Sequence, residues 1–160
     1  MELEEAMSKR KSVRSFSDEP LSKEDINQLL WAGLKCPSAG GIHPLMILVI
    51  NDKETKEKLC IAALNQEAIR RAPVVLVVAA DFARMVNRYH KRGYRYCYME
   101  AGHIGQNISL MAVSLGLGCV MIGAFRDAEV KTVLGIEEDP IYIIPVGRMK
   151  NALSTSVSRS

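Results

Sequence analysis

Two continuous apolar runs constrain the fold of this chain more than any other feature of its sequence. Residues 45–50 read Leu-Met-Ile-Leu-Val-Ile, and residues 73–80 read Pro-Val-Val-Leu-Val-Val-Ala-Ala. Neither run alternates between polar and apolar residues, as a strand with one face in water would. Both therefore predict strands that are covered on two sides.

Helical patterns separate these runs. Ser22 is a candidate N-cap with acidic residues in the first turn, and its helix must end before Pro37, because the residue before a proline disfavours the α region. The longest pattern runs from Tyr96 to Leu115, and its nearly all-apolar second half predicts a long buried central helix that ends at Gly116. Further helices are expected over residues 2–9, 53–65 and 127–134, and short strands over 119–122 and 141–146.

These elements predict an α+β fold in which helices flank a central mixed β-sheet. We expect one domain over residues 1–150 and a C-terminal tail over residues 151–160. Residues 81–95 are polar, basic and aromatic, and predict a surface segment or lid.

Composition restricts the classes of function. A content of 48% hydrophobic and 24% charged residues argues against disorder, and a net charge of +3 is too small for a protein-wide nucleic-acid field. The four cysteines have neither CxxC nor Cys/His spacing, which predicts reduced, buried thiols and no metal site. With an acidic N-terminus, no signal-peptide pattern and no apolar span of about 20 residues, we expect a cytoplasmic protein outside the membrane.

Two motifs near the N-terminus are candidates for ligand binding. The first contains Arg10, Lys11, Ser12 and Arg14, and guanidinium forks match the geometry of phosphate. The second is the small-residue turn 37–41, in which glycine lets the backbone approach a flat ligand. The alternative interpretations are a solvated basic helix face and a simple connecting loop.

In this order the two motifs resemble the flavin-mononucleotide-binding elements of the nitroreductase family. The resemblance extends over about residues 5–148, and its further motifs are Gln106-Asn107, Gly116-Leu117-Gly118, Ile122-Gly123-Ala124-Phe125 and Pro145-Val146-Gly147-Arg148. The chain departs from the family pattern at Gly41, His43 and Leu45, where the family has asparagine, glutamine and tryptophan. Loss of the asparagine removes one side-chain hydrogen bond near the flavin and leaves that contact to the backbone.

The resemblance implies a cytoplasmic, homodimeric, FMN-dependent oxidoreductase of the nitroreductase type. Hydride would pass from NAD(P)H through FMN to an oxidised small-molecule acceptor, such as a nitroaromatic or a quinone, with ping-pong kinetics. FMN would lie at the subunit interface, with residues 10–14 from one subunit and 37–41 from the other. The implied cofactor-binding residues are Arg10, Lys11, Ser12, Arg14, Pro37, Ser38, Ala39, Gly40, Gly41, Ile122, Gly123, Ala124 and Arg148.

The segment from Tyr89 to Tyr96 is similar to one branch of the family, the peptide thiazoline/oxazoline dehydrogenases and their short relatives. A lysine and a tyrosine are implicated there in substrate deprotonation, so Lys91 and Tyr94 are the catalytic candidates. The alternative is a basic lid that shields the flavin. Two other functions remain open: an FMN-binding carrier or regulatory module without turnover, and an azoline dehydrogenase-like oxidase. A nucleic-acid partner is not expected, although the aromatic and basic stretch 88–96 has side chains that stack on bases.

Overall fold

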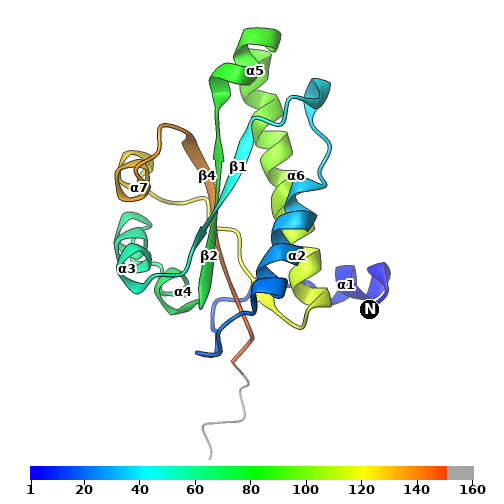
Figure 1. Cartoon of the computed structure of the whole chain (residues 1–160), viewed down its shortest axis with the longest axis vertical. Coiled ribbons are helices and arrows are strands. Elements are labelled where there is room, and N and C mark those ends of the chain that lie inside the picture. Colours follow the sequence, from blue (N-terminus) through cyan, green and yellow to red (C-terminus); the bar gives the residue numbers. More distant parts are fainter. Residues whose placement is uncertain (151–160) are drawn as a thin grey trace, which may run out of the picture.

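The structure is a computed structural model that describes residues 1–150, and the predicted tail 151–160 lies outside the described residues. A four-stranded sheet occupies its centre (Figure 1). Its strands are β1 (Leu45–Ile50), β2 (Val74–Ala80), β3 (Gly118–Cys119) and β4 (Asp139–Gly147), in the spatial order β1-β2-β4-β3. The two apolar runs form β1 and β2, which confirms that both are strands, and the structure makes these strands neighbours in the sheet.

The predicted mixed sheet is wrong, because all three strand pairings are antiparallel. The parallel contact that the described residues contain is an isolated bridge between Ser12 and Cys119. A continuous apolar run records burial on both faces of a strand, and such burial does not determine the direction of the neighbouring strand.

Helices fill the connections, and most begin where the sequence predicts. Ser22 and Asp25 form a reciprocal capping box, in which the Ser22 Oγ accepts from the Asp25 N–H at 3.0 Å. Two short helices, α4 and α5, were not predicted. α4 is also mostly polar. The helices are α1 (Leu3–Lys9), α2 (Lys23–Leu34), α3 (Lys53–Ala62), α4 (Glu67–Arg71), α5 (Phe82–Tyr89), α6 (Arg92–Ser114) and α7 (Asp127–Leu134), with a 3-10 turn, η1, at Ala39–Gly41.

The sheet separates two apolar clusters. Leu76 and Val78 of β2 pack with residues of α2, α5 and α6, whereas Val75 and Val77 pack with residues of α3, α4 and α7. Figure 1 shows these two groups of helices on opposite sides of the strands. Because successive side chains of a strand point to opposite faces, one uninterrupted run of valine and leucine supplies both clusters.

α6 is the longest helix of the described residues and starts at Arg92, four residues before the predicted Tyr96. Its C-terminal half is not covered all round within one chain. Ile108 and Ala112 are fully buried, but Leu110, Met111 and Val113 are only half-buried. Gly116 adopts φ +71 directly after the helix, as expected of a helix-ending glycine.

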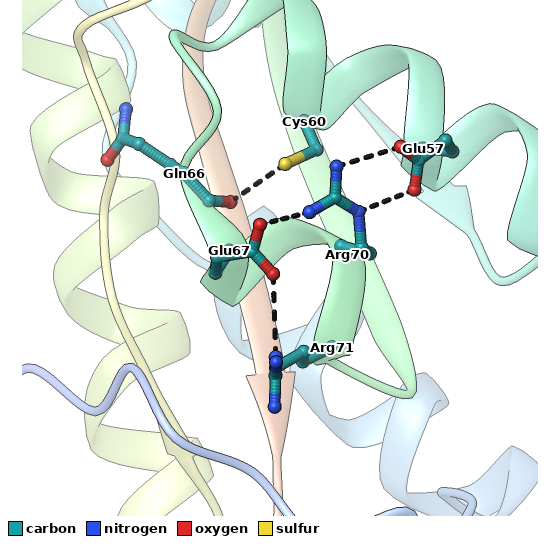
Figure 2. Close-up of polar contacts among 6 residues, drawn as sticks. All are labelled: Glu57, Cys60, Gln66, Glu67, Arg70 and Arg71. Carbon is teal, nitrogen blue, oxygen red and sulfur yellow. Dashed lines mark hydrogen bonds and ion pairs between the residues drawn. The ribbon is translucent and has the colours of Figure 1, made fainter.

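An ion-pair cluster holds α3 against α4 (Figure 2). The Arg70 guanidinium donates to Glu57 at 2.5 and 2.8 Å and also contacts Glu67, and these hydrogen bonds lower the pKa of both carboxyls. Cys60 donates to the Gln66 carbonyl at 3.4 Å, and the Gln66 side chain donates to the Ala124 carbonyl at 2.9 Å. The cluster thus also positions the segment that contains Gly123 and Ala124.

Within residues 1–150, no helix combines the length and the apolar character needed to cross a membrane.

Candidate functional site

The basic segment 10–14 lies beside the short strand β3. The Val13 N–H donates to the Cys119 carbonyl at 2.9 Å, and the Val13 side chain is buried against Gly118. The polar residues of the segment stay at the surface: Lys11, Ser12 and Arg14 are exposed and Arg10 is half-buried. Arg10, Lys11 and Arg14 have no ion-pair partner among residues 1–150, so their positive charge is available to an anion.

The segment 122–124 continues from the same strand. Ile122 is buried and exchanges two backbone hydrogen bonds of 2.9 Å with Ile143, whereas Gly123 and Ala124 are exposed. A Cβ added at Gly123 would have the Tyr142 ring at 3.9 Å as its nearest neighbour, so the backbone there is open to a flat ligand. Arg148 is half-buried and donates from Nε to the Glu19 Oε1 at 2.8 Å.

The loop between α2 and β1 contains the second predicted motif. Its Ser38 Oγ accepts from the His43 N–H at 2.9 Å, and the Gly41 N–H donates to the Ser38 carbonyl at 3.0 Å. Gly40 and Gly41 adopt φ +61 and +64, a left-handed conformation that glycine reaches without strain. A tight turn results, with Pro37, Gly40 and Gly41 exposed and Ser38 and Ala39 half-buried.

α5 holds this loop from outside. The two terminal nitrogens of Arg84 donate to the carbonyls of Ile42 at 2.8 Å and His43 at 3.1 Å. The Tyr89 hydroxyl lies 2.5 Å from where a Gly40 Cβ would stand. Part of the predicted lid 81–95 is therefore helical and packed, and it fixes the shape of the 37–43 turn.

A buried carboxyl group, which no sequence motif indicated, lies behind the turn. Glu100 is 3% exposed; its Oε1 is 3.7 Å from the His43 Nδ1, and its Oε2 has no hydrogen-bond partner within residues 1–150. Burial, with a smaller contribution from this carboxylate, raises the pKa of the buried thiols Cys36 and Cys97, that of Cys97 to about 11. The available signal was one acidic residue on the apolar face of a long helix.

We expect Glu100→Gln to increase the free energy of unfolding by about 1 kcal/mol, because it replaces a buried carboxyl group whose Oε2 has no hydrogen-bond partner within residues 1–150. Urea denaturation measures this, with the exposed Glu137→Gln as a control that should change nothing. A loss of stability in Glu100→Gln would instead mean that His43 holds the carboxylate favourably.

The two predicted motifs lie at different positions along α6. The 37–43 turn contacts Glu100, whereas residues 11 and 13 line a hollow with Val113 and Gly116. Glu100 and Val113 are thirteen residues apart, which is about 20 Å along a helix. One chain therefore does not bring segments 10–14 and 37–41 into a single pocket.

The remaining candidates lie away from segment 10–14. Lys91 is exposed at the N-terminal end of α6, and Tyr94 is 47% exposed with its ring centroid 5.1 Å from that of Phe82. The Asn107 side chain donates to the Ala32 carbonyl at 3.0 Å and joins α6 to α2. Among the described residues, no group of three acidic, cysteine or histidine side chains is placed to hold a metal ion.

The chain is similar to known proteins in sequence and in fold. The model of the nitroreductase family matches residues 7–65 and 60–148. The chain is 39% identical to a protein of Methanocaldococcus jannaschii provisionally named a nitroreductase, over 92% of this chain and 91% of that protein. It is 29% identical to an FMN reductase of Bacillus subtilis, over 91% of this chain and 63% of that enzyme. The structure of the NADPH:FMN oxidoreductase of Vibrio harveyi, complexed with NAD+, matches with a TM-score of 0.84 and 25% identity, over 93% of this chain and 69% of that one.

Proposed function

The chain belongs to the nitroreductase family, and from that premise we propose that it is an FMN-dependent oxidoreductase that uses NAD(P)H to reduce a small oxidised acceptor. The observation that supports this best is a group of cations on one chain segment, Arg10, Lys11 and Arg14, that have no ion-pair partner among residues 1–150. An enzyme whose two substrates use the same face in turn would show ping-pong kinetics.

The residues present fit a flavin mononucleotide. Arg10 and Lys11 would hold its phosphate through charge-assisted hydrogen bonds. Arg148 would also bind the phosphate only if its ion pair with Glu19 were broken. The exposed backbone at Gly123 and Ala124 would face the edge of the ring, since no side chain of the described residues covers it closely. The 37–41 turn would cover the ring with backbone alone, because Gly41 stands where the family has a side-chain donor.

The chain's own residues tune and shield the reaction. FMN bound here would supply the redox chemistry, which is hydride transfer between the nicotinamide and the acceptor. Arg14 would stabilise the negative charge of the reduced ring and so raise the reduction potential. Arg84 and Tyr89 would keep the 37–41 turn in a fixed shape.

We propose that the working form is a homodimer. Leu3, Trp31 and Leu34 are 61%, 58% and 58% exposed, and a hollow of ≈ 320 Å³ lies between α1, α2 and the half-buried apolar residues of α6. Contiguous apolar surface of this kind usually marks an interface. A two-fold axis here would place the 37–41 turn of each subunit near the basic segment of the other subunit, with FMN between them.

The purified protein should be yellow, with FMN released on denaturation, and NADH or NADPH should bleach the flavin absorbance under anaerobic conditions. A colourless protein that gains neither flavin absorbance nor a thermal shift with added FMN would contradict the proposal. Bound FMN that neither nucleotide reduces would favour the carrier or regulatory module instead.

Arg10→Ala is expected to weaken FMN binding by about 1.5–3 kcal/mol, the scale of a hydrogen bond to a charged group. Titration of the apoprotein, followed by flavin fluorescence, measures the loss. Lys9→Ala is the matched control, because Lys9 is already paired with Glu5 at 2.5 Å and should have little effect. Equal and small effects of both changes would show that the segment is only a solvated face.

A further inference from the structure

Besides the basic segment 10–14, the chain has a second concentration of positive charge, at a corner that the proposed FMN site does not use. Residues 82–99 contain five of the 21 basic residues and none of the 18 acidic ones, so the remainder of the chain carries sixteen basic and eighteen acidic residues. We call the group Arg88, His90, Lys91, Arg92 and Arg95 the basic corner. It lies where α5 ends and α6 begins, at the top of Figure 1.

The backbone holds these side chains together. The His90 N–H donates to the Val86 carbonyl at 2.8 Å, and the Gly93 N–H donates to the His90 carbonyl at 2.9 Å. His90 itself adopts φ +51, an uncommon conformation for this residue, and reverses the chain there. Tyr89, His90, Lys91, Arg92 and Arg95 line a surface hollow of ≈ 590 Å³.

The cations of this corner have nothing to neutralise them within residues 1–150. Arg88, Lys91, Arg92 and Arg95 form no ion pair and no side-chain hydrogen bond there, while the nearby Arg84 is engaged by two loop carbonyls. Arg88 lies over the Tyr89 ring, with its guanidinium carbon 5.6 Å from the ring centroid. Lys91, Arg92 and Arg95 lie at the N-terminal end of the 23-residue helix α6, where the helix dipole makes cations unfavourable. No acidic residue in the first turn offsets their charge.

The corner borders the turn that is proposed to cover the flavin. The Tyr89 hydroxyl and the Arg88 Nε lie 2.5 and 3.4 Å from where a Gly40 Cβ would stand. A substrate whose reacting ring enters beside the 37–41 turn could therefore extend its remaining part toward the basic corner.

We propose that the basic corner binds the phosphomonoester of a diffusible nucleotide substrate. Two substrates of the proposed function carry such a dianion: NADPH at its 2′-phosphate, and FMN at its 5′-phosphate when free flavin is the acceptor. Arg92 and Arg95 provide guanidinium forks, and Arg88 and Lys91 add charge. This inference rests on the proposed function and specifies which form of its substrates the enzyme selects.

Steady-state kinetics of the Arg92→Ala/Arg95→Ala holoenzyme test the proposal with four substrates: NADPH, NADH, FMN and riboflavin. The substrates form two matched pairs, NADPH with NADH and FMN with riboflavin, and only the first member of each pair carries the phosphomonoester. In one pair we expect kcat/KM to fall about 10-fold or more for the phosphomonoester substrate and to stay the same for the substrate without that group. The pair that shows the difference identifies the phosphate. The control is Lys53→Ala/Lys58→Ala on α3, which removes the same amount of charge elsewhere. It should leave the ratio of kcat/KM within each substrate pair unchanged.

Binding without turnover separates this inference from the proposed function. If the basic corner selects the 2′-phosphate of NADPH, calorimetry should show that adenosine 2′,5′-bisphosphate binds the wild type more tightly than adenosine 5′-monophosphate. The double variant should bind the two compounds with equal affinity. A variant that reduces flavin normally and keeps every substrate ratio overturns the basic-corner site and leaves the oxidoreductase standing. If the wild type reduces no flavin with either nicotinamide nucleotide, the proposed oxidoreductase activity is wrong. The calorimetry still tests the NADPH site in that case, and equal binding of the two adenosine phosphates would overturn it.

Discussion

Replacing Gly93 by alanine is expected to lower the free energy of unfolding by about 3 kcal/mol. A Cβ at this position would lie 2.7 Å from the Met85 carbonyl carbon and 2.8 Å from the Val86 nitrogen. Both are backbone atoms of α5, so no side chain can rotate away, and α5 must separate from α6. Against a typical total stability of 5–15 kcal/mol, this is a large loss.

Gly105→Ala is the matched control on the same helix. Its added Cβ would meet the Met121 sulfur, the end of a flexible side chain that can take another rotamer. Alanine also favours helix by about 1 kcal/mol relative to glycine, so the net change at Gly105 should be much smaller. Urea denaturation of the two variants measures the difference, and similar losses at both positions would show that the α5–α6 contact is not rigid.

The Gly93 variant should also disturb the loop beyond its effect on stability. α5 carries Arg84 and Tyr89, which hold the 37–43 turn through the Ile42 and His43 carbonyls and at Gly40. If α5 moves, this turn loses its outer support. We therefore expect faster backbone amide exchange over residues 38–43 in the folded variant.

Elements bounded by strong local signals were predictable from the sequence. β1 occupies residues 45–50 and α7 residues 127–134 as expected, and the Ser22 capping box and the stop before Pro37 are local chemistry. The antiparallel pairing of β2 with β1 and β4 was not predictable, because a run buried on both faces fits either direction. α5 was missed because it is short and its basic and aromatic residues indicated a surface segment, although its Met85 packs in the core.

The candidate site was only partly predictable for a similar reason. Segments 10–14 and 37–41 could be found as motifs, but their separation along α6 depends on tertiary packing. Glu100 was not predicted to be buried, since a single acidic residue in a helix is usually exposed. Nor could the sequence show that Arg148 faces Glu19, a contact between residues far apart in the chain.

The separation of the two motifs leads to a second prediction with a large effect, in which two inactive subunits restore one site. An Arg10→Ala/Arg14→Ala subunit lacks the basic segment's charges but keeps the turn. A Gly40→Val subunit keeps the charges but loses the turn, because valine is strained at φ +61 and its Cβ would meet the Tyr89 hydroxyl. Each homodimer should bind almost no FMN at concentrations that saturate the wild type.

The heterodimer, isolated with two different affinity tags, should bind one FMN per dimer, half the wild-type amount. Its two intact parts then come from different chains, and a two-fold axis places them in the same site. Within one chain these parts lie beside Glu100 and Val113 of α6, which are about 20 Å apart along the helix. A site confined to one subunit would remain broken in every combination. A heterodimer without flavin, or a mass of one chain for a wild type that still binds FMN, would therefore exclude the shared site, whereas recovery of half the binding requires a second subunit to complete it.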